Sequence, residues 1–422
     1  MPHPVLPQAA RYEQIENMFS SLRVREFRIY WVSMFVSLIG SWVQTMAQSW
    51  LVFRLTHSAF LMGLTGFLSY LPVSFFALAA GVYVDRSVKR NLLLVTQSCF
   101  TILALVLAFL VWTGTVRIWH VIMMATINGF ILSFDSPTRQ AMVVELVGRQ
   151  HLMNAIALNS AAFNSARIIG PAVAGLLIAL IGMSGCFFAN AVSYLPVLAA
   201  LALIKPRPAA VRKNQASVFS DIRESVLLVR HNRFLLFLLA LVGLVSTFGV
   251  SYVVLMPIFA QEVLGSGAMG LAILMSSSGV GALIGVLNVA RLKNELARFR
   301  LLRLSVIVFF LSAMAFSVSR NMWASCILLV LAGIGISGGM ALVNSMIQLS
   351  IPDHHRGRIM GLFMMMFMGF IPFGNLLFGL LAQAFGVQEV VFFAALASIL
   401  VYWPFSRRFL SDRQAFEERA YS

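Results

Sequence analysis

The segment Phe134-Asp135-Ser136-Pro137-Thr138-Arg139 places an acid and a base four residues apart within an apolar stretch. Residues at this spacing lie on one face of a helix, so Asp135 and Arg139 can form an ion pair. If the helix ends near Leu146, Asp135 lies roughly 16 Å inside it, close to the middle of a bilayer. An ionisable side chain at this depth is costly and indicates a functional site. Reversible protonation of this carboxylate could drive work.

A second base, Arg167, lies about equally deep in the next apolar stretch. We expect Arg167 to approach Asp135 as a movable partner. A ligand, or a separation of helices, would then weaken this contact and let Asp135 take up a proton. Two other interpretations remain open: a static buried ion pair that fixes helix register, and direct contact of these residues with a substrate.

The composition indicates that most of the chain lies in a membrane. Of the 422 residues, 60% are hydrophobic and only 11% are charged, whereas a soluble domain carries about 25% charged residues. A helix needs about 20 apolar residues to cross a bilayer. This window predicts an all-α polytopic membrane protein with twelve transmembrane helices. The predicted spans are 27–53, 59–83, 91–113, 118–146, 154–181, 185–204, 234–260, 267–290, 301–319, 322–350, 358–384 and 388–406.

The longest polar connection separates six spans from six, and a weak repeat (Gly63-Leu64 and Gly270-Leu271) supports two pseudo-repeats. Apolar residues recur at helical spacing within this connection, which predicts an amphipathic helix at the membrane surface. The predicted organisation is an N-terminal tail (1–26), a six-helix bundle (27–204), a linker with the amphipathic helix (205–233), a second six-helix bundle (234–406) and a C-terminal tail (407–422).

The basic residues behind the net charge of +16 are concentrated in loops on one side of the predicted membrane spans. The two tails and every second loop hold 26 of the 31 Lys and Arg residues. By the positive-inside rule both termini of this multi-pass membrane protein are then cytoplasmic. No folded basic module suggests nucleic-acid binding. The sequence has no nucleotide-binding loop, zinc signature or hydrolase elbow. We therefore expect no enzymatic activity, no cofactor and no metal site.

One loop carries a recognisable motif, Gly81-Val-Tyr-Val-Asp85-Arg86-Ser-Val-Lys89-Arg90. It resembles the G-x-L-A-D-R-x-G-R-K loop of the major facilitator superfamily, and it departs from that pattern at Tyr83, Val84 and Val88. The resemblance implies the two-bundle transporter fold and a cytoplasmic gate. Asp85 would lie against the start of helix 11 near Gly361, and Arg86 would pair with Glu145. The implied gate residues are Asp85, Arg86, Lys89, Arg90 and Glu145.

Longer stretches, 42–55 and 137–158 together with Arg356-Gly357-Arg358, resemble the enterobactin-exporter-like and macrolide-efflux-like permeases of that superfamily. Gly170-Pro171 with Gly175 resembles the G-P-x-x-x-G of its exporters. The resemblance implies a secondary transporter, an antiporter that exports a siderophore or drug-like compound by alternating access. With it, we assign proton coupling to Asp135, Arg139 and Arg167.

The predicted substrate cavity is mostly neutral, with methionines and aromatic residues that suit an amphiphilic molecule. Its predicted polar residues are Gln44, Gln48, Asn128, Asn159, Asn164, Tyr252, Asn344 and Asn375. The predicted partners are a proton, an amphiphilic small molecule and membrane lipids, and the protein is expected to be a monomer. Two alternatives stay open: a lysophospholipid or other lipid flippase on the same fold, and a receptor or scaffold that transports nothing.

Overall fold

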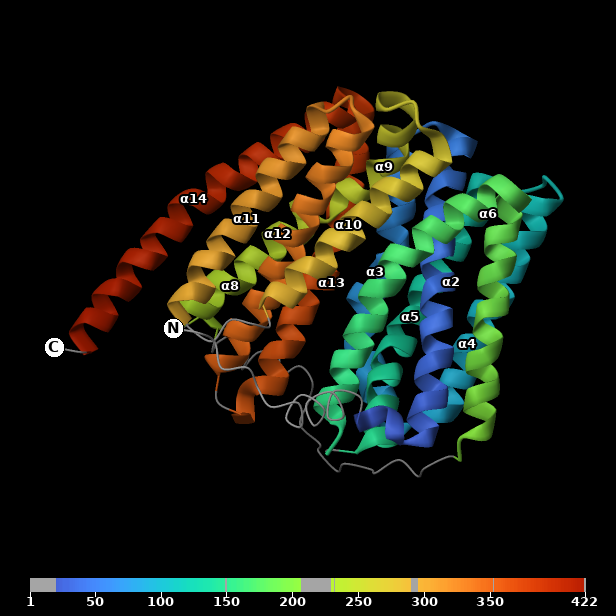
Figure 1. The fold of residues 1–422 in the computed structure, drawn as a ribbon, viewed down its shortest axis with the longest axis horizontal. Coiled ribbons are helices and arrows are strands. Elements are labelled where there is room, and N and C mark those ends of the chain that lie inside the picture. The colour runs from blue at the N-terminus through green and yellow to red at the C-terminus, as the bar shows by residue number, and fades with distance from the viewer. Residues whose placement is uncertain are drawn as a thin grey trace, which may run out of the picture.

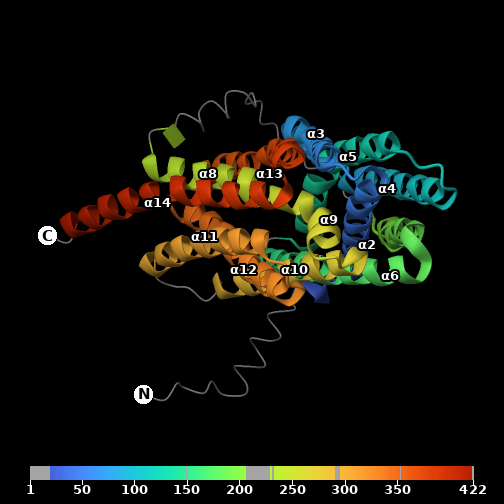
Figure 2. The ribbon, with the colours of Figure 1, turned by 90° about the horizontal axis from the view of Figure 1, so that it is seen from above.

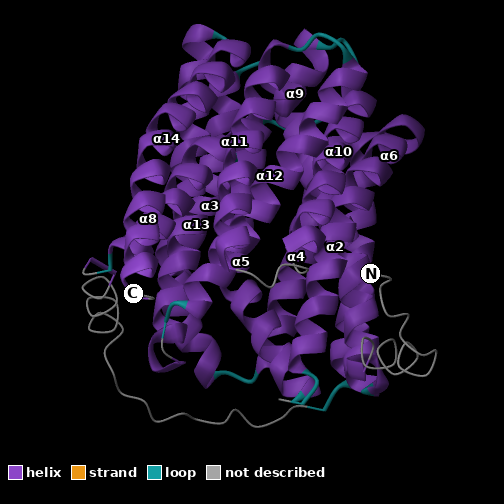
Figure 3. Ribbon diagram, turned by 60° about the vertical axis from the view of Figure 1, so that its left-hand side comes forward, coloured by secondary structure: helices purple, strands orange, loops and turns teal. Residues whose placement is uncertain are grey.

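The computed structural model describes residues 20–148, 150–205, 229–230, 232–289, 295–351 and 353–420. Within these ranges the secondary structure is helical throughout, and no strand occurs (Figure 3). The predicted amphipathic helix of the linker lies outside the described residues. The predicted C-terminal tail, by contrast, is largely helical, because the last helix continues to Ala420.

The N-terminal half begins with a short 3-10 turn and continues with long helices joined by tight turns. Ser58 caps the second long helix by accepting a hydrogen bond from the backbone N–H of Leu61, which satisfies one of the free donors of that helix start. The elements are η1 (Ser20–Arg23), α2 (Arg25–Thr56), α3 (Ala59–Arg86), α4 (Lys89–Trp112), α5 (Ile118–Val147) and α6 (Leu152–Leu203).

Helix α6 crosses the membrane twice. It has 52 residues, which corresponds to about 78 Å, whereas the bilayer core is about 30 Å thick. Gly182 interrupts it with φ 76° and ψ −179°, a backbone conformation essentially restricted to glycine. Eleven described helices are long and apolar enough to span a membrane. Counting α6 as two spans gives the twelve predicted crossings, divided near the predicted boundary between 154–181 and 185–204.

Gly182→Ala is expected to destabilise the protein by about 1–3 kcal/mol, because a Cβ is strained at this φ and ψ. Thermal unfolding in detergent micelles would measure the loss. Gly369→Ala is the matched control, since Gly369 lies inside helix α13 (Asp353–Phe385) with nothing within 4 Å of an added Cβ. Equal melting temperatures for both variants would contradict the assignment of strain to Gly182.

The C-terminal half starts with an irregular crossing. Its first span combines α-helical, 3-10 and π-helical turns: α8 (Arg233–Leu244), η2 (Val245–Gly249), η3 (Ser251–Leu255), α9 (Met256–Ile258) and η4 (Phe259–Val263). The sequence predicted one plain span here. Short π-helical segments inside helices often mark functional sites. The remaining elements are α10 (Gly267–Val289), α11 (Glu295–Val318), α12 (Met322–Leu349), α13 (Asp353–Phe385) and α14 (Val387–Ala420).

The two halves form two lobes, α2 to α6 and α8 to α14 (Figures 1 and 2). They meet mainly where α3 packs against α13 and α6 packs against α10. At one end, which we call the closed end, a Cβ on Gly63 would lie 2.7 Å from the Gly379 Cα. There Ser58 Oγ also donates a hydrogen bond of 2.9 Å to Gln383 Oε1. This close approach of two backbones requires glycine.

The opposite end of the same helix pair differs. An added Cβ on Gly81 of α3 or on Gly361 of α13 would meet nothing within 4 Å. We call this the open end, and the two lobes diverge toward it in Figure 1. The two halves are therefore in close contact at the closed end, whereas Gly81 and Gly361 at the open end do not contact the described residues of the other half.

Candidate functional site

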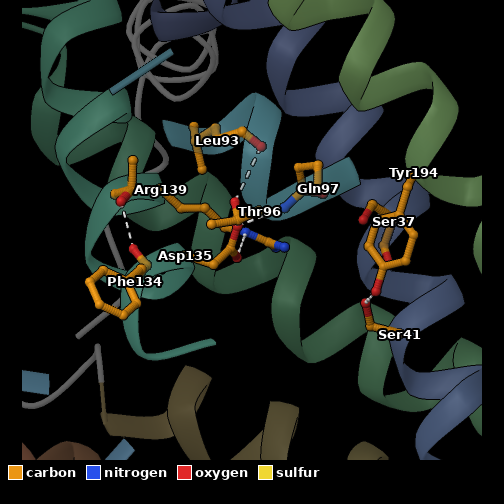
Figure 4. Close-up of polar contacts among 10 residues, drawn as sticks. Ser37, Ser41, Leu93, Thr96, Gln97, Phe134, Asp135, Arg139 and Tyr194 are labelled. Atoms are coloured by element: carbon orange, nitrogen blue, oxygen red, sulfur yellow. Dashed lines mark hydrogen bonds and ion pairs between the residues drawn. The ribbon is translucent and has the colours of Figure 1, made fainter. Parts of the chain in front are cut away.

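Asp135 is completely buried, with 0% of its surface exposed. It lies twelve residues before Val147, the last residue of α5, or about 18 Å from that helix end. Its Oδ2 forms an ion pair with Nε of Arg139, one turn later on the same helix. Its Oδ1 accepts hydrogen bonds of 2.7 Å from both Thr96 Oγ1 and Gln97 Nε2 of α4 (Figure 4). Two hydrogen-bond donors and one cation therefore surround the carboxylate.

Sequence reasoning missed the two partners on α4. The buried face of this helix includes Leu93, Thr96, Gln97 and Phe100, which recur at the spacing of one helical face. Packing of that face against α5 carries Thr96 and Gln97 to the carboxylate. The available signal was two adjacent polar residues on the buried face of an otherwise apolar helix.

Two tyrosines complete the surroundings of the Asp135–Arg139 pair. Tyr30 of α2 and Tyr194 of α6 both lie near the two charged side chains. The Tyr194 hydroxyl lies 3.4 Å from Ser41 Oγ of α2. The Tyr30 hydroxyl is buried without a hydrogen-bond partner among the described residues. The pair thus lies inside the N-terminal half, surrounded by four helices of that half.

The prediction that Arg167 contacts Asp135 is wrong. Arg167 Nη2 instead donates a hydrogen bond of 3.3 Å to Ser278 Oγ of α10, and its Cζ lies 5.9 Å from the centroid of the Trp42 ring. An added Cβ on Gly279 would lie 3.0 Å from the Arg167 carbonyl oxygen. The two helices cross at this point, so the Arg167 side chain lies at the interface between the halves.

The five predicted gate residues make their described contacts within the N-terminal half. The predicted pair Arg86–Glu145 is not formed; Lys89 Nζ lies 3.8 Å from Glu145 Oε1 instead. Lys89 is the first residue of α4 and is buried, while Arg86 is exposed at the end of α3. Arg90 donates to the carbonyls of Leu201 and Ala202 at 2.7 and 3.3 Å, near the end of α6.

Asp85 also differs from expectation. It is exposed, and its carboxylate forms no hydrogen bond or ion pair with a described residue, so the predicted contact near Gly361 is absent in this conformation. The departure of the motif at Val88 has a structural explanation. Val88 has φ −72° and ψ 109°, an extended conformation that any residue adopts. The two-residue turn between α3 and α4 therefore does not require glycine there.

The eight predicted cavity residues do not form one cluster. Gln44 accepts a hydrogen bond of 2.6 Å from Asn190 Nδ2, a buried partner that sequence reasoning missed. Asn375 packs against Gly66 at the α3–α13 crossing, and Tyr252 is 3% exposed beside Phe309 and Phe316. Asn344 accepts a hydrogen bond from Gln348, and Asn164 donates one to the Ser160 carbonyl. Gln48, Asn128 and Asn159 are partly exposed.

The family described as "Transmembrane secretion effector" matches residues 16–418. The chain belongs to this family of the major facilitator superfamily. The match covers both halves, and so the Asp135 pair, Arg167 and the loop of Asp85 all lie within it.

Two relatives of this major facilitator protein are exporters or transporters by name. The staphyloferrin A transporter of Staphylococcus aureus is 25% identical over 380 residues, covering 89% of this chain and 94% of the relative. Macrolide efflux protein A of Streptococcus pyogenes is 22% identical over 372 residues, covering 86% and 91%. A solved bacterial homologue of the human lysosomal transporter Spinster superposes with a TM-score of 0.73 at 12% identity, covering 92% and 98%. The chain is a multi-pass membrane transporter and not an enzyme.

Proposed function

We propose that this transporter exports an amphiphilic small molecule, siderophore-like or drug-like, in exchange for protons by alternating access. The observation that carries proton coupling is the Asp135 carboxylate, which is fully buried at mid-membrane depth, accepts two hydrogen bonds and forms one ion pair. A carboxylate can couple proton binding to transport only at a site where the loss of its charge changes the conformation of the protein. The names of the relatives support small-molecule export.

In this proposal Asp135 and the ligand site are separate, and α2 connects them. Tyr30 of α2 lies near Asp135, and Ser41 of α2 lies 3.4 Å from the Tyr194 hydroxyl. Trp42, the residue after Ser41, lies against Arg167 at the interface between the halves. Protonation of Asp135 would release Arg139, Thr96 and Gln97, and so change how α4 and α5 pack against α2. Movement of α2 would then reach Trp42. Asp135, with Arg139, would carry the proton in this scheme.

We also propose that the open end faces the cytoplasm of a bacterial inner-membrane protein, with both termini on that side. The basic loops predicted to be cytoplasmic support this orientation. In this conformation Asp85 and Arg86 are exposed and unpaired with described residues, as expected of a cytoplasmic gate that is open. Closure would bring the open ends of α3 and α13 together and separate the closed ends.

The test of proton coupling is the ligand-driven release of protons from the detergent-purified transporter in weakly buffered solution. Staphyloferrin A and a macrolide are the ligands tested, and a pH-sensitive dye reports the released protons. The wild type is expected to release protons on binding, whereas Asp135→Asn, which lacks a titratable group at this site, releases none. Glu262→Gln removes an exposed acid and is the matched control. Equal release from wild type and Asp135→Asn would remove Asp135 from the mechanism, and binding without release from either would remove proton coupling.

A further inference from the structure

Arg167 is a charged side chain in the membrane interior that has no acidic partner among the described residues. It forms no ion pair with any described carboxylate; its single side-chain hydrogen bond goes to the neutral Ser278 hydroxyl at 3.3 Å. The other deeply placed base, Arg139, has Asp135 beside it. A cation without a counter-charge is costly to hold in a low-dielectric site. An intramembrane base of this kind therefore indicates a function that needs positive charge.

The surroundings of Arg167 come from both halves of the molecule. Trp42 of α2 lies against the guanidinium. From the other half come Ser278 of α10, which accepts the hydrogen bond from Arg167, and Tyr252 of η3, which lies near both Arg167 and Ser278. Ser276 Oγ of α10 donates a hydrogen bond of 2.8 Å to the carbonyl of Ile168, the residue after Arg167. The guanidinium thus lies where both halves would contact a centrally bound molecule.

The chemistry of this cluster favours an anion. A guanidinium has five N–H donors in a planar fork that matches a carboxylate. Among the described side chains, this fork donates a hydrogen bond only to Ser278. Arg167 remains partly exposed, so a ligand can approach it, whereas Asp135 is sealed at 0% exposure. The Trp42 ring offers an apolar surface beside the charge, which suits a ligand that has an acidic group next to an apolar body.

We propose that Arg167 binds the acidic group of the transported molecule, with Ser278 and Tyr252 as neutral hydrogen-bonding groups and Trp42 packing against its apolar part. The substrate class is then an amphiphilic organic anion and not an organic cation. This inference rests on the proposed function only in placing the transported molecule between the halves. The anion can come from the aqueous phase as a soluble acid or from the bilayer as an anionic phospholipid headgroup, since both offer the same oxygens to the guanidinium.

The experiment compares 1-naphthaleneacetate with its neutral isostere 1-naphthaleneacetamide in equilibrium binding to the full-length protein in neutral detergent. The wild type is expected to bind the anion at least about tenfold more tightly, because hydrogen bonds to charged groups are the stronger ones. Arg167→Gln is expected to lose this preference while still binding the amide. Arg167→Lys should keep much of the preference, and Arg320→Gln, which removes an exposed charge, should keep all of it.

Three results would overturn the proposal: no measurable binding of the acetate to the wild type, equal affinity for the acetate and the amide, or an unchanged preference in Arg167→Gln. Phosphatidylglycerol added to the micelles separates the two sources. Displacement of the acetate by it, but not by phosphatidylcholine, identifies a lipid headgroup as the anion; no displacement identifies a soluble acid. The assay needs neither transport nor a pH gradient, so a failure of proton-coupled export leaves the anion site standing, and the reverse also holds.

Discussion

Arg139→Gln is expected to lower the free energy of unfolding by about 3–5 kcal/mol, which is the effect of leaving one partner of a buried ion pair without the other. Asp135 is sealed from solvent, and Thr96 and Gln97 occupy only its Oδ1. Removal of Arg139 leaves Oδ2 without its ion-pair partner. Unfolding in SDS from detergent micelles would measure the change.

The double variant Asp135→Asn/Arg139→Gln is the decisive control for this prediction. It removes both charges, so it should recover most of the stability lost in Arg139→Gln. Its change in unfolding free energy should therefore be much smaller than the sum of the changes in the two single variants. Arg54→Gln, at an exposed position, should change the unfolding free energy by less than about 0.5 kcal/mol. If Arg139→Gln were as stable as the wild type at pH 8, the pair would not be the charge-balanced unit described here.

Locking the closed end is expected to abolish transport. Ser58 and Gln383 are hydrogen-bonded across the two halves, so cysteines at both positions can be bridged by a short reducible cross-linker. In a background that lacks Cys99, Cys186 and Cys326, the bridged Ser58→Cys/Gln383→Cys protein should transport at the level of protein-free vesicles. Reduction of the bridge should restore transport, because alternating access requires these helix ends to separate.

The controls for this prediction use the same chemistry without a lock. Each single cysteine variant, treated with the same reagent, should keep its activity. Transport by the bridged protein at the rate of the reduced protein would show that the closed end does not open during the cycle, and the rocking of one half against the other would have to be abandoned.

The sequence was sufficient for the fold because its signals there are long or local. Twelve apolar stretches and a two-part repeat predicted the two lobes, and even the break near Gly182 coincided with the predicted boundary between two spans. The Asp135–Arg139 pair was also predictable, because four-residue spacing fixes two side chains on the same helical face whatever the tertiary structure.

Contacts between helices were not predictable in the same way. The direction of the Arg167 side chain depends on the rotation of α6 about its axis and on its crossing with α10 at Gly279, and no local pattern encodes either. The pairing of Glu145 with Lys89 instead of Arg86 depends on the turn at Ser87 and Val88, which directs the first residue of α4 inward. Such choices require knowledge of how two elements pack.

The place of Arg167 along its helix has a mechanical consequence. It lies fifteen residues from Leu152 and fifteen from Gly182, so each arm of this span is about 22 Å long. A rotation on the order of 15° about the crossing of α6 with α10 would move the ends of this span by about 6 Å. Groups at the crossing itself would hardly shift. A molecule gripped there can stay bound while access to it passes from one side of the membrane to the other.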